Sequence, residues 1–114
     1  MKNIAQLAIV VPCFNEEEVL PKSIKTLEKI RTALIKDKLI SDNSFLVFIN
    51  DGSKDKTWKI IEQHHKQNNN IKGICLSRNF GHQEALLAGL YNTKADIYIT
   101  IDADLQDDPN VIKD

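Results

Sequence analysis

Four acidic side chains and a glutamine follow one apolar stretch of this sequence. Asp102, Asp104 and Gln106 alternate along it, and residues two apart in an extended backbone point to the same side. Carboxylates held that close repel one another unless a cation or a proton lies between them. Oxygen-only ligands suit Mg²⁺ or Mn²⁺, which keep water molecules and bridge substrate phosphates. We therefore expect a metal or nucleotide role for Asp102 and Asp104, whereas Asp107 and Asp108 cap the next helix.

Asp51 closes a second apolar stretch and is followed by a glycine and Ser53. Such an aspartate is common in turns, and Ser53 or Asp55 would then cap the helix that follows. The Asp51 carboxylate could equally accept the N–H groups of a base or the hydroxyls of a ribose. The roles of Asn15 and Glu16 are undecided in the same way between ligand binding and structure, because acidic residues are also common where helices begin.

Few cationic side chains accompany these clusters. Arg78 carries a planar guanidinium that suits phosphate oxygens, and it could equally form a structural ion pair with one of the acidic residues. His82 stands at the start of a helix, where it contacts a ligand or is simply exposed. His64 and His65 lie on a polar helical stretch and are assigned no role, and no zinc-type ligand spacing occurs.

Alternating strands and helices are expected to hold these residues in place. Apolar, β-rich stretches predict strands at residues 7–11, 45–49, 71–77 and 97–101, the first of them ended by Pro12. Near-continuous apolar strands linked by helices indicate a parallel sheet that is covered on both faces. Because right-handed crossovers are the rule, the chain forms a βαβαβαβ half of a doubly wound fold.

Three helical segments connect the predicted strands. The first has Pro21 in its first turn, three glutamates (residues 16–18) at its N-terminus and an apolar face that consists of Leu20, Ile24, Leu27 and Leu34. The second begins near Asp55 and turns Trp58, Ile61 and His65 inward. The third follows Gly81 and offers a small, closely packing face.

The predicted fold class is therefore α/β: a Rossmann-like half with a mostly parallel sheet of about four strands and helices on both faces. In such sheets ligands bind beyond the carboxyl ends of the strands, near the point where the strand order reverses. The polar clusters at residues 12–16, 50–53, 77–82 and 102–108 each follow a predicted strand. We expect all four to meet at one edge of the sheet.

Composition narrows the class of protein. The 114 residues fit one domain, and 42% hydrophobic and 27% charged residues are ordinary for a soluble globular protein. A net charge of −1 provides no basic field for nucleic acid, so we expect a small-molecule site. Cys13 and Cys75 are far apart, which favours two half-buried free thiols over a disulfide. No apolar run approaches a membrane span, so the chain as given is expected to be cytoplasmic.

Several motifs, taken in order along the chain, resemble those of the family 2 glycosyltransferases, which have the GT-A fold. The opening motif is similar to residues 10–17 (VVPCFNEE), the second motif to residues 50–53 (NDGS) and the DxD motif to residues 102–104 (DAD). Two further motifs narrow the resemblance to the polyprenyl-phosphate subgroup. They are residues 76–83 (LSRNFGHQ) and 102–109 (DADLQDDP). This subgroup includes dolichol-phosphate mannosyltransferases and bactoprenol-phosphate glucosyltransferases. The match spans essentially the whole chain. Two residues depart from it, a cysteine at position 13 and an asparagine at position 50.

The resemblance implies a set of residues that bind a UDP- or GDP-linked sugar. The loop that cradles the base and the ribose matches Pro12, Asn15 and Glu16, and the acid that bonds the base matches Asp51. Arg78 falls in a motif of the subgroup and is added to this set.

The resemblance also implies a Mg²⁺ or Mn²⁺ site. Asp102 matches the acid near the ribose and the metal, and Asp104 and Gln106 match the metal ligands that hold the diphosphate. A bound cation would neutralise the charge of the departing diphosphate while a polyprenyl phosphate displaces it, with inversion at the sugar. A phosphate monoester has a second pKa of about 6 and needs little help from a base. No catalytic residue is assigned, and a base elsewhere would instead indicate a hydroxyl acceptor.

Other classes of protein explain less of the sequence. A non-catalytic doubly wound binding or interaction domain would account for the strands and turns but not for the acidic residues after one strand. A DxD phosphohydrolase would place a nucleophilic aspartate after the first strand, where Pro12 and Cys13 stand. A Rossmann dehydrogenase would carry a GxGxxG motif there.

We expect residues 1–114 to be the N-terminal, nucleotide-sugar-binding part of a longer glycosyltransferase domain. Asp108 and Pro109 are typical of a helix start, yet the chain stops at Asp114. On this expectation the acceptor half and any membrane helices are absent, and the fragment alone is inactive. Uncovered apolar surface at the last strand would favour self-association. The complete protein would lie at the cytoplasmic face of a membrane.

Overall fold

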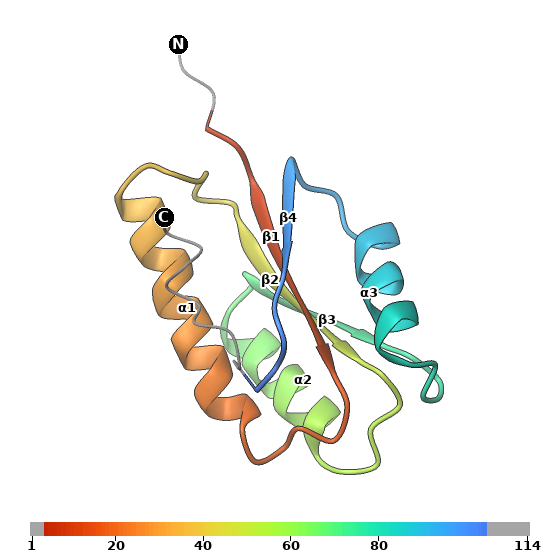
Figure 1. Ribbon diagram of the computed structural model, residues 1–114. Helices are drawn as coiled ribbons and strands as arrows, with labels where there is room; N and C mark the ends of the chain where they lie inside the picture. The colour runs from red at the N-terminus through yellow and green to blue at the C-terminus, as the bar shows by residue number, and fades with distance from the viewer. Residues whose placement is uncertain (1–3, 105–114) are drawn as a thin grey trace.

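One parallel sheet organises the computed structural model, which describes residues 4–104 (Figure 1). Its strands are β1 (Leu7–Cys13), β2 (Phe45–Asn50), β3 (Ile71–Cys75) and β4 (Ile97–Thr100). The order across the sheet is β3-β2-β1-β4, and all neighbouring strands are parallel. The chain thus moves outward from β1 to β3 and then returns past β1 to β4, so the strand order reverses beside β1. The predicted α/β fold with a parallel sheet is confirmed.

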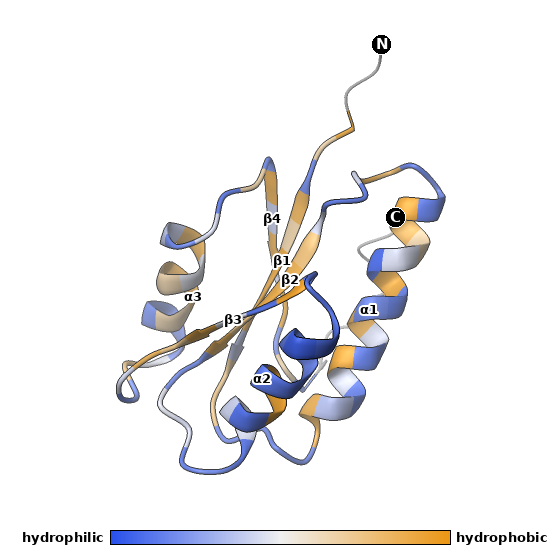
Figure 2. Ribbon diagram, turned by 180° about the vertical axis from the view of Figure 1, so that it is seen from behind, coloured by the Kyte–Doolittle hydropathy of each residue, from blue (hydrophilic) through white to orange (hydrophobic). Residues whose placement is uncertain are grey.

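Three helices cover the two faces of this sheet. They are α1 (Leu20–Lys36), α2 (Thr57–Gln67) and α3 (His82–Tyr91). The first two pack on one face and α3 packs on the other (Figures 1 and 2). In the described part of the chain, no helix has both the length and the apolar character needed to cross a membrane.

The strand β1 lies at the centre of the core, and all seven of its residues are buried. Alternate side chains point to opposite faces, so that Leu7 and Ile9 meet α1 and α2 whereas Ala8 and Val10 meet α3. The prediction that Pro12 ends this strand was wrong, because β1 pairs with β2 as far as Cys13. Pairing with β4 ends at Val10, so the missing N–H of Pro12 removes no bond of the sheet.

The predicted apolar face of α1 is confirmed, since Leu20, Ile24, Leu27 and Leu34 are all buried. Pro21 lies in the first turn, as expected. The prediction that three glutamates stand at the N-terminus of this helix was wrong, because α1 begins only at Leu20 and its first turn contains no acidic residue.

The ends of α2 and β3 differ in detail from the prediction. The side chain of Ile61 is buried, but His65 is exposed, and its Nδ1 lies 2.6 Å from the carbonyl oxygen of Ile71. This contact ties the end of α2 to the start of β3, which ends at Cys75 rather than at residue 77. Both cysteines are free, as predicted, but neither is half-buried, because Cys13 is buried and Cys75 is exposed.

The small face of α3 brings this helix close to the sheet. Ala85 and Gly89 are buried against β1 and β2. A Cβ atom at Gly89 would lie 2.7 Å from Cγ1 of Val10 and 2.8 Å from Cδ1 of Ile49, so a side chain there would push the helix outward. The close approach holds the N-terminus of α3 at the carboxyl edge of the sheet.

The strand β4 forms one edge of the sheet in the described part of the chain. Large apolar side chains on this strand stay exposed, including Ile97 and Tyr98. Such surface was expected from the sequence. The self-association that it would favour stays a prediction.

Candidate active site

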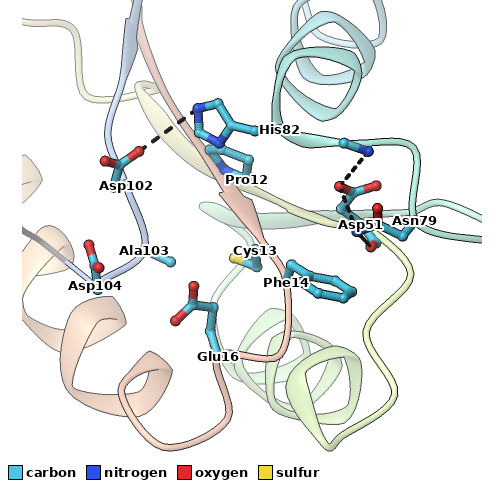
Figure 3. A pocket seen from close by; sticks show the side chains of 11 residues that line it. Pro12, Cys13, Phe14, Glu16, Asp51, Asn79, His82, Asp102, Ala103 and Asp104 are labelled. Atoms are coloured by element: carbon cyan, nitrogen blue, oxygen red, sulfur yellow. Dashed lines mark hydrogen bonds and ion pairs between the residues drawn. The ribbon is translucent and has the colours of Figure 1, made fainter.

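A cavity of about 500 Å³ opens at the carboxyl edge of the sheet (Figure 3). The segments that follow all four strands contribute to its walls, as the pattern of polar clusters predicted. Five of the predicted site residues line it: Pro12, Glu16, Asp51, Asp102 and Asp104. The edge of the sheet where the strand order reverses therefore carries a cavity with three acidic residues near one end.

Asp102 and Asp104 border the cavity on either side of Ala103, which is buried. The carbonyl oxygen of Ala103 accepts a hydrogen bond of 2.5 Å from the hydroxyl of Ser23 on α1. This bond fixes the backbone between the two acidic residues. Both carboxyl groups therefore border one space, as their spacing in the sequence predicted.

Glu16 adds a third acidic group to this end of the cavity. Partial burial raises the pKa of its carboxyl, and the negative charges of Asp104, Asp55 and Asp102 raise it further. Its backbone N–H donates to Oγ1 of Thr57 at 2.9 Å, which holds the segment after β1 against the start of α2. The carboxyl groups at this end of the cavity therefore repel one another.

The donor chemistry at this end suits a divalent cation that also binds a ligand phosphate. Among residues 4–104, no three His, Cys, Asp or Glu side chains gather closely enough to hold a metal ion. Mg²⁺, however, is usually held by one or two carboxylates, with water and substrate phosphates completing its shell. Asp102 and Asp104 fit that pattern. The third predicted ligand, Gln106, lies outside the described residues, as do Asp107, Asp108 and the predicted helix start.

His82 brings the one imidazole that lines the described cavity. It is the first residue of α3, and its Nε2 lies 4.0 Å from Oδ1 of Asp102. Both side chains are about half exposed, at 63% and 47%, so a ligand could reach either of them. The sequence alone did not decide whether His82 contacts a ligand or is simply exposed.

Asp51 is almost fully buried, and donors of this chain engage its carboxylate. Oδ1 accepts the backbone N–H of Phe80 at 2.8 Å, and Oδ2 accepts that of Gly81 at 3.1 Å. The side-chain amide of Asn79 donates to Oδ2 at 3.3 Å and to the carbonyl oxygen of Asp51 at 3.1 Å. Asp51 therefore holds the loop between β3 and α3 against the end of β2.

Gly52 lets these two loops touch. Its φ of 69° lies in the left-handed region, and a Cβ atom there would come within 2.2 Å of the backbone nitrogen of Asn79. Because that neighbour is backbone, no side chain fits at this position. The loop wall that includes Asn79 and Gly81 is thus built on the turn that follows β2.

Asn15 and Arg78 do not line the cavity. The backbone N–H of Asn15 donates to Oγ of Ser53 at 2.9 Å, and its Oδ1 accepts the N–H of Lys54 at 2.8 Å, which joins the loops after β1 and β2. The guanidinium of Arg78 stacks on the ring of Phe80 at 4.3 Å from the centroid. A contact of either residue with a nucleotide sugar stays a prediction.

Phe14 and Asn79 line the cavity without having been singled out in the sequence. Phe14 is 44% exposed, so its ring is accessible to a ligand in the cavity. In Figure 3 Asn79 lies beside Asp51 and Phe14 lies lower, beside Cys13, and both are on the side of the cavity away from Asp102 and Asp104. Their position in loops directly after strands was the only available signal, and many structural residues share it.

The family model described as "Glycosyl transferase family 2" matches residues 8–114. This chain belongs to that family. The resemblance of its motifs to family 2 glycosyltransferases is thereby confirmed. The cavity with Asp102 and Asp104 lies within the matched region.

Individual relatives agree with this assignment. The uncharacterized glycosyltransferase YkoT of Bacillus subtilis is 50% identical over 110 residues, which cover 95% of this chain and 33% of YkoT. The bactoprenol glucosyl transferase of Shigella phage SfX is 41% identical over 107 residues, which cover 94% of this chain and 33% of the phage protein. This family 2 chain thus spans about a third of the length of these relatives.

A solved structure has the same fold. The mannosyltransferase PcManGT from Pyrobaculum calidifontis, in complex with GDP-Man and Mn²⁺, superimposes with a TM-score of 0.71 at 17% sequence identity. The likeness covers 90% of this family 2 chain and 28% of the mannosyltransferase. At this identity the likeness establishes the fold alone, and it confirms the predicted α/β fold of the GT-A type.

Proposed function

We propose that residues 1–114 form the nucleotide-sugar-binding part of a glycosyltransferase that moves a sugar from a UDP- or GDP-linked donor to a polyprenyl phosphate at the cytoplasmic face of a membrane. The observation that carries the proposal is the cavity at the carboxyl edge of the sheet. One end is lined by Glu16, Asp102 and Asp104, and the other by the ring of Phe14, the amide of Asn79 and the carboxylate of Asp51, which already accepts hydrogen bonds within the chain. A nucleotide sugar has the same division into a diphosphate and a base.

The acidic end is proposed to bind the diphosphate through Mg²⁺ or Mn²⁺. Asp102 and Asp104 would hold the cation, together with Gln106, and phosphate oxygens and water would complete its shell. Glu16 supports this assignment, because burial and the neighbouring carboxylates raise the pKa of its carboxyl. A cation bound here would relieve that crowding of negative charge.

The other end is proposed to bind the nucleoside. Phe14 offers it an apolar wall, and Asp51 lines the same end with Asn79 beside it. Pro12, which lies beside His82 in Figure 3, lines the cavity between the two ends. Aromatic rings stack on nucleobases, and a half-exposed ring beside a cavity is suited to that contact. Asn15 would support this wall from behind, through its bonds to Ser53 and Lys54.

The proposed transfer requires little general acid–base catalysis from these residues. A phosphate oxygen of the acceptor attacks the anomeric carbon, the bond from that carbon to the diphosphate oxygen breaks, and the configuration inverts. The divalent cation, when bound, supplies stabilisation of the charge that develops on the diphosphate. The residues of this chain bind and orient the donor so that its anomeric carbon faces the acceptor. The acceptor phosphate is already largely dianionic at neutral pH.

The names of similar proteins support the choice of substrates. A relative that is 41% identical is a bactoprenol glucosyl transferase, and a protein of the same fold was solved with GDP-Man and Mn²⁺. Together they favour a lipid phosphate as acceptor and a metal-bound sugar nucleotide as donor.

A transfer assay tests the proposal. The protein, as the cell expresses it, is incubated with Mn²⁺, undecaprenyl phosphate and radiolabelled UDP- or GDP-sugars, and lipid-linked sugar is measured. We expect label in the lipid phase and a loss of at least about 100-fold in the Asp104→Asn variant, because charge stabilisation at the leaving group is removed. The matched variant Asp42→Asn, at the opposite edge of the sheet, keeps full activity. Label that reaches only hydroxyl acceptors would contradict the proposed acceptor.

A further inference from the structure

Three successive backbone N–H groups of the loop after β1 donate to side chains of the turn after β2. The donors belong to residues 15–17, and the acceptors are, in order, Oγ of Ser53, Oγ1 of Thr57 and Oδ2 of Asp55, at 2.9, 2.9 and 3.2 Å. The partners are 38 to 41 positions apart in the sequence. The contact is a clamp that Ser53, Asp55 and Thr57 make on the loop after β1.

The needs of helix α2 do not account for the whole clamp. From the sequence we expected Ser53 or Asp55 to cap this helix. In the structure Oδ1 of Asp55 does accept the N–H of Thr57, the first residue of α2, at 2.9 Å. The other carboxylate oxygen of Asp55 and the hydroxyl of Ser53 instead accept N–H groups of the loop after β1. These two acceptors therefore serve the loop rather than the helix.

Thr57 connects the two sides of the clamp. Its side chain is fully buried, and its Oγ1 accepts the N–H of Glu16 while donating to Oδ1 of Asp55 at 2.5 Å. A hydroxyl can do both because it carries one donor and two acceptor lone pairs. Valine has nearly the same shape and can do neither. The hydroxyl of Thr57 thus holds the backbone at Glu16 in a fixed place.

The clamp determines which groups the loop presents to the cavity. The side chain of Glu16 lines the cavity at the end where Asp102 and Asp104 lie (Figure 3). The N–H groups of residues 15–17 are engaged by the turn. In glycine-rich phosphate-binding loops, such N–H groups face the phosphate instead. This loop therefore meets a ligand through side chains, and their placement depends on the clamp.

We infer that Thr57, Asp55 and Ser53 are positioning residues for the loop after β1, and that Thr57 acts on donor binding through Glu16. None of these three residues is among those that line the described cavity, so their effect is indirect. The inference rests on the proposed function. It adds to that function a support of the donor site by residues that the sequence analysis assigned only to a turn and a helix cap.

Binding of Mn²⁺ in the presence of UDP or GDP tests the inference in the protein as the cell expresses it. Free Mn²⁺ is measured by electron paramagnetic resonance. Thr57→Val, which removes the hydroxyl at nearly constant volume, should weaken Mn²⁺ binding by about tenfold, as loss of a supporting hydrogen bond does at metal sites. Thr57→Ser keeps the hydroxyl and should restore the affinity to within about twofold. Thr93→Val removes a half-buried hydroxyl that bonds the carbonyl oxygen of Gly89, and this matched control should bind normally.

Two further measurements distinguish positioning from general damage to the fold. The double variant Thr57→Val with Glu16→Gln should lose no more Mn²⁺ affinity than Glu16→Gln alone, because both changes act through one side chain. In the transfer assay, Thr57→Val should raise KM for the nucleotide sugar and leave kcat and KM for the polyprenyl phosphate unchanged. If Thr57→Val does not fold, Ser53→Ala takes its place with the same expected results, since it removes another acceptor of the clamp.

Several results would overturn the inference and leave the proposed function intact. They are normal Mn²⁺ affinity in Thr57→Val, an equal loss in Thr57→Ser, additive losses in the double variant, and a rise of KM for both substrates. Absence of Mn²⁺ binding in the folded, unmodified protein with either nucleotide would instead remove both the inference and the proposed function.

Discussion

At the scale of single residues, negative charge is the main feature of the end of the cavity that Glu16, Asp102 and Asp104 line. The carboxyl groups of Glu16, Asp102 and Asp104 border one space, and the imidazole of His82 lies 4.0 Å from one of them, that of Asp102. Repulsion of this kind is a cost to the folded state that a bound cation would lift. The stability of the protein should therefore depend on pH and on divalent metal in a defined direction.

Glu16→Gln should stabilise the protein near neutral pH. The pKa of this carboxyl is higher in the folded state than its ordinary value of 4.5, so the folded state holds its proton more tightly than the unfolded state does. Stability consequently falls as pH rises from 4.5 through the raised pKa, and the glutamine variant avoids that fall. Thermal unfolding in metal-free buffer should give a higher Tm for the variant at pH 7 and no difference at pH 4. Equal gains at both values would contradict this account, and Glu62→Gln on α2 serves as the control.

Gly52→Ala should destabilise the protein strongly. The added Cβ would lie 2.2 Å from the backbone nitrogen of Asn79 in a left-handed conformation, so both strain and overlap oppose it. We expect the free energy of unfolding to fall by at least about 2 kcal/mol in urea titrations. Lys54→Ala, an exposed change two residues along, should cost less than about 0.5 kcal/mol. A neutral effect of Gly52→Ala would mean that the two loops do not touch.

At the scale of elements, each functional segment is held by a neighbour that is distant in the sequence. The carbonyl group of Ala103, between the two acidic residues, is bonded to Ser23 on α1. The loop after β3 is bonded to Asp51 at the end of β2. Helix α1 therefore contributes to the proposed metal site without lining it.

Ser23→Ala should weaken both the fold and the proposed metal site. Its hydroxyl is buried and donates to the carbonyl oxygen of Ala103, which would lose this bond. The free energy of unfolding should fall by about 1–3 kcal/mol, and the affinity for Mn²⁺ with a nucleotide should fall as well. Thr32→Ala, which removes a hydroxyl from the exposed side of the same helix, is the matched control and should change neither quantity appreciably. Unchanged Mn²⁺ affinity in Ser23→Ala would separate α1 from the site.

The elements that the sequence predicts well are those with a strong repeating pattern. The buried face of α1 repeats every three to four residues, and the strands are nearly continuous apolar runs, so both were found. The ends of elements were less predictable. Pro12 continues β1 because β4 no longer pairs there, and His65 turns outward because β3 offers its nitrogen a carbonyl group. Both outcomes depend on neighbours that are remote in the sequence.

At the scale of the whole molecule, parallel topology explains why motifs scattered over ninety residues form one site. The carboxyl ends of parallel strands lie at the same edge, so the convergence of the polar clusters could be predicted once the fold was. The sequence could not predict which side chains enter the cavity. Asn15 and Asp51 are engaged by backbone groups of neighbouring loops, and Phe14 stays half exposed, outcomes that depend on loop conformations without a repeating pattern.

The central claim is that the acidic end of the cavity binds a divalent cation that bridges to a nucleoside diphosphate. Thermal unfolding with UDP or GDP, with and without Mn²⁺, tests it most directly in the unmodified protein, in Asp104→Ala and in the control Asp42→Ala. One nucleotide should stabilise the protein only with Mn²⁺, by about 2.7 kcal/mol at a hundredfold excess over its dissociation constant. The effect should vanish in Asp104→Ala and persist in Asp42→Ala. Equal stabilisation of Asp104→Ala and the unmodified protein would contradict the claim.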